Sequence, residues 1–103
     1  MRLIGREVLD KFKRRRPDAR SQVDLWSHDI READWRTLAD LKRDYPSASL
    51  LPQSRVIFNI KGNQYRLVVI AVLVAGTISV EWAGSHAEYD KLDFSGNEIK
   101  RKR

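Results

Sequence analysis

Apolar positions recur at helical spacing in the first half of the chain. One stripe, Val8, Leu9 and Phe12, predicts a helix over residues 6–16. Residues 1–4 precede it and read either as a short strand or as a lead-in segment. The chain is therefore expected to begin with helices that each bury one apolar face.

Two further helices are expected before the middle of the chain. Residues 19–33 carry a second apolar stripe, made of Val23, Trp26, Ile30 and Ala33. Asp18 directly precedes this segment and is a candidate N-cap, since a carboxylate there accepts free N–H groups of the first turn. A Thr-x-x-Asp sequence from Thr37 predicts the start of a third helix, which Pro46 ends. Residues 47–54 are expected to form a loop.

The period then changes from that of a helix to that of a strand. The segment RVIFNIKGNQYRLVVIAV predicts a β-hairpin with a two-residue turn at Gly62-Asn63. This turn pairs Lys61 with Gln64, Ile60 with Tyr65, Asn59 with Arg66, and Phe58 with Leu67. Alternation then assigns one face to the core: Val56, Phe58, Ile60, Tyr65, Leu67 and Val69. The opposite face receives Arg55, Asn59 and Arg66.

A second turn, at Ala75-Gly76, leads into the strand TISVEWA. Pairing through this turn sets Val69 opposite Trp82, Ala71 opposite Val80, and Leu73 opposite Ile78. Glu81 then lies opposite Ile70, on the face of Arg66. The expected fold class is α+β, with N-terminal helices packed on a small antiparallel sheet and a short C-terminal helix. We expect a single domain, residues 1–103, with a basic tail from about residue 95.

Composition narrows the possible functions. There is no cysteine, which excludes a disulfide framework, a thiolate zinc site and a thiol nucleophile. The longest apolar run, residues 67–75, is much shorter than the roughly 20 residues of a membrane helix, so a cytoplasmic protein is expected. Lys and Arg number 20 against 14 acidic residues, a net charge of +6, which favours an acidic partner such as RNA, the ribosome, an anionic membrane or an acidic protein. The basic runs at residues 11–16 and 100–103, taken alone, are typical of a solvated helix face and a frayed tail.

The stretch GSHAEYDKLD, residues 84–93, follows the last predicted strand. Its Ser-His-Ala-Glu sequence has the form of a capping box and makes His86 the first residue of a short helix. Tyr89 lies three residues later and therefore shares a helix face with His86. This places an imidazole and a phenol together at the exit of the strand, near the face of Arg66.

These residue types suit RNA cleavage. Breaking an RNA strand needs a base for the 2′-hydroxyl, positive charge for the phosphate and an acid for the 5′-oxygen, and it needs no metal. Histidine titrates near neutral pH, and tyrosine donates a proton or a hydrogen bond. Arg66 can grip a phosphate and Lys61 can add charge at the hairpin tip. Each residue also has a structural interpretation: His86 as a helix-start residue, Tyr89 as packing, and Arg66 as an ordinary exposed charge. The two histidines are too far apart in sequence to indicate a metal site.

Two segments, VIFNIKGNQYRLVV and GSHAEYDKLD, closely resemble the HigB-type toxins of bacterial type II toxin–antitoxin modules, within the RelE-like group. The helical segment ADWRTLADLKRDYPSAS agrees in order, and the resemblance runs over roughly residues 1–93. It implies a RelE-like fold and a ribosome-dependent mRNA endonuclease, an mRNA interferase. It also implies a helix-turn-helix antitoxin that neutralises the toxin and represses their shared operon, so that operator DNA is bound only through the antitoxin.

The resemblance carries the motif onto Asn59, Lys61, Gly62, Asn63, Tyr65, Arg66, His86, Glu88, Tyr89 and Asp90. We take His86, Tyr89 and Arg66 as the expected catalytic residues, without deciding which of His86 and Tyr89 is the base. Asn59, Lys61, Asn63 and Lys91 are expected to bind RNA, Glu88 is kept as the capping residue, and neither cofactor nor metal is expected.

One departure from such toxins leaves a second function open. Glu81 stands where they commonly carry an arginine, and a carboxylate on the presumed RNA face weakens phosphate binding unless it pairs with Arg66. The alternative is therefore a catalytically weakened or inactive module of the same fold that binds RNA or an antitoxin. A ribosome-independent nuclease is a third possibility. A membrane binder is least favoured, because no helix sets a strongly apolar face opposite a basic one.

Overall fold

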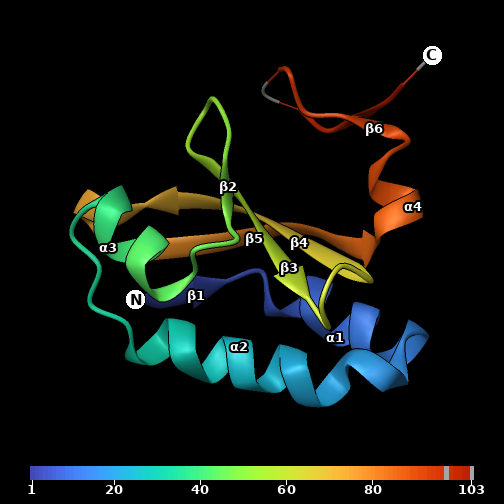
Figure 1. Cartoon of the computed structure of the whole chain (residues 1–103), viewed down its shortest axis with the longest axis horizontal. Helices are drawn as coiled ribbons and strands as arrows, with labels where there is room; N and C mark the ends of the chain where they lie inside the picture. Colours follow the sequence, from blue (N-terminus) through green and yellow to red (C-terminus); the bar gives the residue numbers. More distant parts are fainter. Residues whose placement is uncertain (97, 103) are drawn as a thin grey trace.

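Helices α1 and α2 cover one face of a five-stranded sheet, and the C-terminal segment crosses the other face (Figure 1). The computed structural model describes residues 1–96 and 98–102. The helical elements are α1 (Arg6–Arg15), η1 (Pro17–Ala19), α2 (Arg20–Glu32), α3 (Leu38–Asp44), η2 (Leu73–Ala75) and α4 (His86–Tyr89). The strands are β1 (Arg2–Ile4), β2 (Ser49–Leu50), β3 (Arg55–Ile60), β4 (Tyr65–Val72), β5 (Thr77–Ser85), β6 (Leu92–Asp93) and β7 (Lys100–Arg101). None of the helices described is long and apolar enough to cross a membrane.

The three N-terminal helices are confirmed, but one predicted cap is wrong. Thr37 forms a full capping box at α3: its side chain accepts the N–H of Asp40, and the Asp40 carboxylate accepts the N–H of Thr37. Asp18 does not cap α2, since it lies inside the short helix η1 and no side chain caps the first turn of α2. The Asp18 carboxylate instead binds the hydroxyl of Tyr65 on β4.

The sheet is mixed rather than antiparallel. Its strand order is β1-β5-β4-β3-β2, and β1 pairs in parallel with β5 while the other neighbours are antiparallel. Residues 1–4 therefore contain a strand and are not only a lead-in segment. The loop predicted over residues 47–54 is interrupted by β2, which adds a two-residue edge to β3. Neither short strand has a hydrophobic repeat long enough to be recognised in the sequence.

The predicted β3–β4 hairpin is confirmed residue by residue. Asn59 pairs with Arg66, and the neighbouring pairs are those expected from the Gly62-Asn63 turn. The Gln64 N–H donates to the Lys61 carbonyl across the turn, at 3.2 Å. Within the turn, the left-handed φ angles fall on Lys61 (55°) and Gly62 (65°), and not on Asn63.

The predicted register between β4 and β5 is wrong. Val69 lies opposite Val80 instead of Trp82, because the connection at η2 is longer than the two-residue turn that was assumed. A bulge at Glu81 then shifts the remaining pairs by one residue, so Val68 faces Trp82. Since successive strand residues point to opposite faces, this shift moves Trp82 off the helix-covered side of the sheet.

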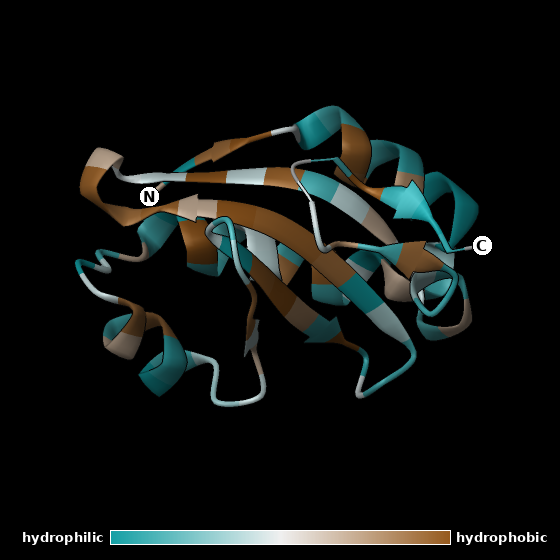
Figure 2. Cartoon of the chain, turned by 90° about the horizontal axis from the view of Figure 1, so that it is seen from above, coloured by the Kyte–Doolittle hydropathy of each residue, from teal (hydrophilic) through white to brown (hydrophobic). Residues whose placement is uncertain are grey.

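The helix-covered face holds the main core, as predicted. Apolar residues run along the central strands, while hydrophilic residues gather on the outward helix turns and loops (Figure 2). All six predicted core positions of the hairpin are buried there: Val56, Phe58, Ile60, Tyr65, Leu67 and Val69. They pack against the helix stripes, which contribute Leu9, Phe12, Val23, Trp26, Ile30 and Leu41.

The opposite face holds a second, smaller apolar cluster that the sequence reasoning missed. Ile57, Val68 and Phe94 are its buried members, and Leu51, Trp82, Tyr89, Leu92 and Ile99 pack around them. Phe94 belongs to the C-terminal segment, which is held by the pairing of β6 with β7. The basic tail is therefore ordered over Lys100–Arg101 rather than frayed, while Arg103, its last residue, lies outside the described residues. This face was expected to be polar because Arg55 and Arg66 dominated its pattern.

Gly5 joins β1 to α1 and gives a direct test of this arrangement. Its φ is 88°, and a Cβ added there would lie 2.5 Å from the Val80 carbonyl oxygen of β5. Gly76 also has a left-handed φ, 70°, but a Cβ there would meet nothing within 4 Å. Both Gly→Ala changes pay for the unfavourable φ, and only Gly5→Ala adds a backbone clash.

We therefore expect Gly5→Ala to lower the free energy of unfolding by about 1–3 kcal/mol more than Gly76→Ala does. Urea denaturation of the two variants and the unchanged protein measures this difference. Equal losses would contradict the close approach of Gly5 to β5.

Candidate functional site

The start of α4 is fixed by its own capping box. The Ser85 hydroxyl accepts the N–H of Glu88 at 3.1 Å, and the Glu88 carboxylate accepts the N–H of Ser85 at 2.9 Å. This confirms the capping box predicted from the sequence and makes His86 the first residue of the helix. The His86 N–H donates to the Gln64 carbonyl at 3.0 Å, which ties the helix to the tip of the β3–β4 hairpin.

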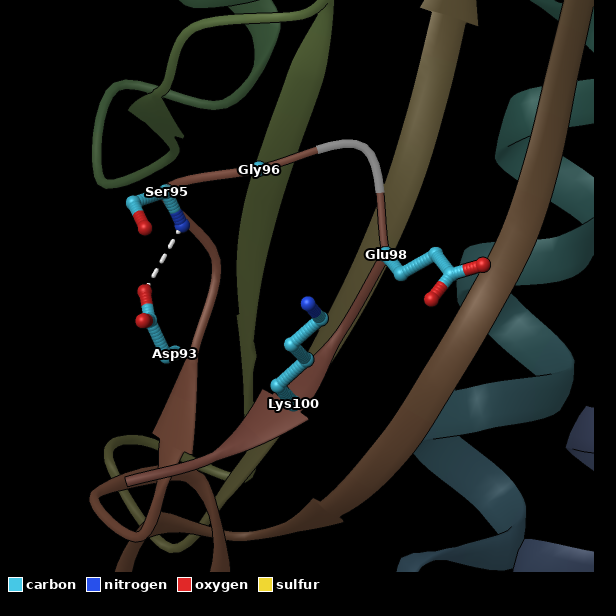
Figure 3. Close-up of a pocket in the computed structure, with 5 residues that line it drawn as sticks. All are labelled: Asp93, Ser95, Gly96, Glu98 and Lys100. Atoms are coloured by element: carbon cyan, nitrogen blue, oxygen red, sulfur yellow. Dashed lines mark hydrogen bonds between the residues drawn. The ribbon is translucent and has the colours of Figure 1, made fainter. Parts of the chain in front are cut away.

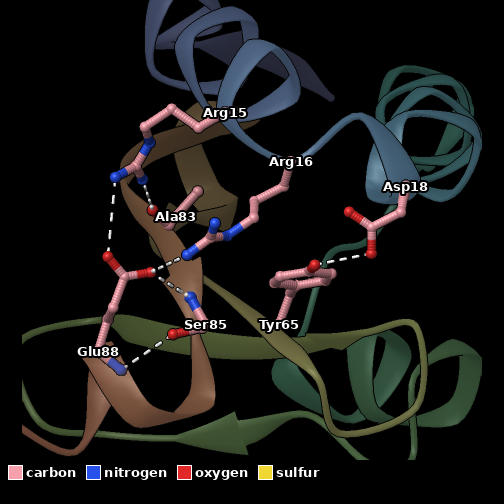
Figure 4. A network of polar contacts seen from close by, with 7 residues as sticks. All are labelled: Arg15, Arg16, Asp18, Tyr65, Ala83, Ser85 and Glu88. Atoms are coloured by element: carbon pink, nitrogen blue, oxygen red, sulfur yellow. Dashed lines mark hydrogen bonds and ion pairs between the residues drawn. The ribbon is translucent and has the colours of Figure 1, made fainter.

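Glu88 also connects α4 to the end of α1 (Figure 4). The guanidinium groups of Arg15 and Arg16 each lie 3.7 Å from its carboxylate oxygens, and Arg15 donates to the Ala83 carbonyl at 3.3 Å. The pKa of Glu88 is lowered mainly by the backbone N–H of Ser85, with further lowering by the Ser85 hydroxyl and by the two arginines; burial opposes the shift. Two arginines of the basic run are thereby brought to α4.

A second polar group lies beside the hairpin tip. The Tyr65 hydroxyl donates to Asp18 at 2.7 Å, and the Lys61 ammonium lies 3.0 Å from the same oxygen. The hydrogen bond from Tyr65 is the main cause that lowers the pKa of Asp18, followed by Lys61, and the same bond raises the pKa of Tyr65. Lys61, predicted as a phosphate ligand, therefore has part of its charge balanced by Asp18.

Arg66 is held by an aromatic ring rather than by a carboxylate. Its guanidinium carbon lies 4.6 Å from the centre of the Tyr89 ring, within the range of a cation–π contact. Its Nε is buried and has no hydrogen-bond partner. Within residues 1–96 and 98–102, no carboxylate forms an ion pair with Arg66. No carboxylate of the described residues therefore compensates its positive charge.

Aromatic side chains surround Tyr89. Phe94 stacks on it at 5.0 Å with an interplanar angle of 20°, and Trp82 lies 6.2 Å away at 54°. The Trp82 indole lies over Gly84, the ladder partner of Arg66: a Cβ on Gly84 would be 2.6 Å from the indole. Tyr89 is thus half-buried packing, as one interpretation of the sequence had it, and it also lies under Arg66, while its expected role in proton transfer stays a prediction.

His86 is the exposed member of this group. Its Nε2 lies 3.7 Å from the Asp90 carboxylate one turn later, and 45% of its side chain is exposed. It therefore pairs with Asp90 when protonated. An imidazole in this position is open to a ligand on the solvent side of α4.

The predicted RNA-binding residues are spread around this group. The Asn59 amide donates to the Ser47 carbonyl at 3.4 Å, and Asn63 is exposed in the hairpin turn. Lys91 follows α4 and lines a cavity of about 410 Å³. The other residues that line it are Trp82, Glu88, Leu92, Arg101 and Lys102. Cations of the C-terminal ribbon therefore lie near Lys91, although they are distant from it in sequence.

Arg55 and Glu81 correct the sequence-based picture of this face. Arg55 was expected beside Arg66 on an open face but is 1% exposed. Its Nε donates to Glu81 at 2.9 Å, and its NH1 group donates to the carbonyls of Phe94, at 3.0 Å, and Gly96. Glu81 therefore pairs with Arg55 and not with Arg66. The longer connection at η2 places Ser79 opposite Ile70 where Glu81 was expected, and the bulge leaves Glu81 without a ladder partner on β4.

The structure thus brings Arg66, Tyr89 and His86 to one end of the sheet, and leaves Lys61 in an ion pair at the hairpin tip. The sequence reasoning missed Arg15, Arg16 and Phe94. The two arginines were read as part of a solvated face, and only the capping glutamate could have indicated their partner. Phe94 had no periodic pattern around it. In the part of the chain that the structure describes, no group of three or more His, Asp or Glu side chains is arranged to hold a metal ion.

Comparison with known proteins adds one finding. The family model of the HigB toxin, the RelE-like toxic component of a toxin–antitoxin system, matches residues 19–92. This range includes both strands of the hairpin, β5, α4 and every residue predicted for the site. No curated protein matches the chain.

The ion pairs of Glu88 lead to a pH-dependent prediction. Glutamine at this place of a capping box can still accept the Ser85 N–H, but it is uncharged toward Arg15 and Arg16. The folded-state pKa of Glu88 is below its ordinary value of 4.5, so the stability it contributes is complete above that value and is lost as the pH falls through the folded-state pKa.

We expect Glu88→Gln to lower the free energy of unfolding by up to about 1 kcal/mol near neutral pH, since exposed ion pairs are screened by water. The loss should shrink as the pH falls from about 6 to about 3, and urea denaturation at several pH values measures it. Glu32→Gln, the same change at a carboxylate with no ion pair within the described residues, is the control. A loss that does not change with pH would argue against the role of the charge.

Proposed function

The chain belongs to the HigB toxin family, the RelE-like toxic components of toxin–antitoxin systems, and on that basis we propose that it is an mRNA endoribonuclease acting on the ribosome. The proposal takes residues 1–103 as one toxin domain. The observation that carries it is the uncompensated guanidinium of Arg66, held against Tyr89 on the helix that begins with His86. Cleavage of a phosphodiester bond in RNA is favoured by this combination: a fixed cation beside the phosphate and two groups that transfer protons.

The reaction is an internal transesterification. The 2′-oxygen of the RNA attacks the adjacent phosphorus, the bond from phosphorus to the 5′-oxygen breaks, and the products are a 2′,3′-cyclic phosphate and a 5′-hydroxyl. One proton leaves the 2′-oxygen and one reaches the 5′-oxygen, so the proton balance is even. We assign these two transfers to His86 and Tyr89, and the stabilisation of the charged phosphorane to Arg66. No step calls for a metal or an organic cofactor.

RNA binding is assigned to the groups around this centre. Asn59, Lys61, Asn63 and Lys91 keep the roles proposed from the sequence, and Arg15 and Arg16 are added to them. Of these cations, Lys61 is the most compensated, because Asp18 accepts its hydrogen bond. Arg66 is therefore the first candidate for a direct contact with the scissile phosphate.

The partners follow from the family. A toxin of a toxin–antitoxin system has an antitoxin as its partner. We propose that this antitoxin is a helix-turn-helix protein, that operator DNA is contacted only through it, and that the toxin meets messenger RNA on the ribosome. A ribosomal substrate implies a cytoplasmic place of action.

The alternative of an inactive binding module rested on Glu81. That carboxylate was expected to face Arg66 and to repel a phosphate. It is instead paired with the buried Arg55 at 2.9 Å, so it does not neutralise Arg66. This removes the specific reason for expecting lost activity.

The proposal predicts toxicity that depends on named side chains. Induced expression without the antitoxin should arrest growth, and His86→Ala or Arg66→Ala should relieve the arrest. In single-turnover cleavage of ribosome-bound message, we expect losses of about 10²–10⁴-fold for His86→Ala and about 10²–10³-fold for Arg66→Ala. Arg36→Ala removes an equally charged but exposed side chain near α3 and serves as the control. A folded, abundant and harmless protein would contradict the proposal.

A second prediction concerns the contact with phosphate. Each phosphate neutralised on single-stranded RNA contributes a slope of about −0.7 in the logarithm of affinity against the logarithm of salt concentration. Arg66→Ala should therefore make the slope shallower by about 0.7, whereas Arg36→Ala should leave it unchanged. Fluorescence anisotropy of labelled RNA over a salt series measures both. An unchanged slope for Arg66→Ala would exclude a phosphate contact by this residue.

A further inference from the structure

Four side chains form a continuous stack on the face of the sheet that the helices leave uncovered. Arg66 lies over Tyr89 at 4.6 Å, Tyr89 stacks with Phe94 at 5.0 Å, and the Arg55 guanidinium lies 6.0 Å from the Phe94 ring. Two of these residues come from the sheet and two from the segment that follows it. The stack therefore links the C-terminal segment to Arg66.

Phe94 is the member of the stack whose burial is unusual for its position in the chain. It is buried, at 8% exposure, although it lies in a segment with little regular structure. Its backbone carbonyl accepts a hydrogen bond from Arg55, which also binds Glu81 and the Gly96 carbonyl. If Phe94 left the sheet, the buried Arg55 guanidinium would lose a carbonyl acceptor, which is costly.

The chain on either side of Phe94 is also fixed. The Ser95 N–H donates to the Asp93 carboxylate at 2.9 Å, which turns the chain directly after the ring (Figure 3). Asp93 pairs with Lys100 where β6 meets β7, and the Lys102 N–H donates to the Lys91 carbonyl at 2.8 Å. These bonds close the segment into a ribbon that holds the ring in place.

We propose that Phe94 is a positioning residue for RNA cleavage, which it serves by holding the Tyr89 ring against Arg66. This inference rests on the proposed function of Arg66 and Tyr89, and it adds Phe94, from the C-terminal segment, to the residues that position the site. Phe94 touches neither the RNA nor the reacting atoms. It acts because the ring of Tyr89 has one stacked neighbour that fixes its plane, and the plane of that ring sets the place of the guanidinium.

The physical reason is orientation. Arg66 has a buried Nε without a partner and no ion pair within the described residues, so the Tyr89 ring is its main constraint. When the ring is free to tilt, the guanidinium loses its fixed position. A displacement of about 1 Å at a catalytic group can lower a rate by as much as about 10²-fold, even when binding is hardly affected.

Kinetics separates this role from simple packing. Phe94→Leu fills much of the space but cannot stack, and Phe94→Tyr keeps the ring. For Phe94→Leu we expect kcat on ribosome-bound message to fall by about 10-fold or more, while KM changes by no more than about twofold. For Phe94→Tyr we expect both kcat and KM to stay near those of the unchanged protein. Ile99→Ala, which removes an apolar side chain of the same cluster outside the stack, should leave kcat unchanged. Thermal melting of each variant establishes that it is folded.

A double-mutant cycle tests whether Phe94 acts through Tyr89. In a Tyr89→Ala background, Phe94→Leu should have no further effect on the cleavage rate, because the ring it orients is gone. Independent, multiplicative losses would overturn the proposal. So would a Phe94→Leu protein that cleaves as fast as the unchanged one.

An NMR measurement tests whether Phe94 holds the Tyr89 ring against Arg66, and it does not require RNA cleavage. The Arg66 guanidinium lies over the Tyr89 ring, so we expect the ring to displace the NMR resonance of the Arg66 Nε–H proton upfield. Phe94→Leu should move it toward the position of an exposed arginine, and Phe94→Tyr and Ile99→Ala should not. If the unchanged protein cleaves no RNA, the proposed function fails, yet this resonance still decides the role of Phe94. A resonance that is insensitive to Phe94→Leu would overturn the role.

Discussion

A buried guanidinium must find partners, and the partners of Arg55 hold the uncovered side of this molecule together. Arg55 is fully buried on β3, where an unpaired charge costs several kcal/mol. Its bonds reach Glu81 on β5, across the intervening strand β4, and the carbonyls of Phe94 and Gly96 in the C-terminal segment. One side chain thereby fixes the bulged strand and the segment that covers it. The bulge at Glu81 supplies the carboxylate, and this explains why an acid stands at that position.

The site depends at one end on the bonds of Arg55 to Glu81, Phe94 and Gly96, which we call the clamp, and at the other end on Glu88. The clamp holds Phe94, and through it Tyr89, beneath Arg66. Glu88 caps α4 and binds the arginines at the end of α1, which fixes where His86 begins the helix. The groups proposed for proton transfer and the cation proposed to bind phosphate are therefore positioned by residues without a chemical step of their own in the proposal. A short helix of four residues would not hold such positions by itself.

The sequence predicted what depends on local periodicity and on short-range capping. The three helix stripes, the β3–β4 register and the capping box at Ser85 follow from patterns within a few residues. The β4–β5 register failed first because the connection at η2 is longer than the assumed two-residue turn. It failed again at Glu81 because a bulge has no signature in a run where Ile78, Val80 and Trp82 alternate as an unbroken strand would. Arg55 was placed on an open face for a different reason. Alternation along a strand predicts which face of the sheet a side chain is on, but not which segment covers that face. For the site, the sequence indicated Arg66, His86 and Tyr89, whose placement as a group the structure supports and whose roles stay proposals. The contacts of Phe94 and of Arg15 and Arg16 join segments distant in sequence, which no local pattern encodes.

Amide hydrogen exchange over residues 90–96 tests most directly whether the buried Arg55 holds the C-terminal segment on the sheet. The comparison is between the unchanged protein and Glu81→Gln, which leaves the Arg55 charge without its carboxylate at nearly constant volume. The account predicts slow exchange of this segment in the unchanged protein and much faster exchange in Glu81→Gln, while β3 and β4 stay protected in both. Fast exchange in the unchanged protein, or equal protection in the two proteins, would contradict it.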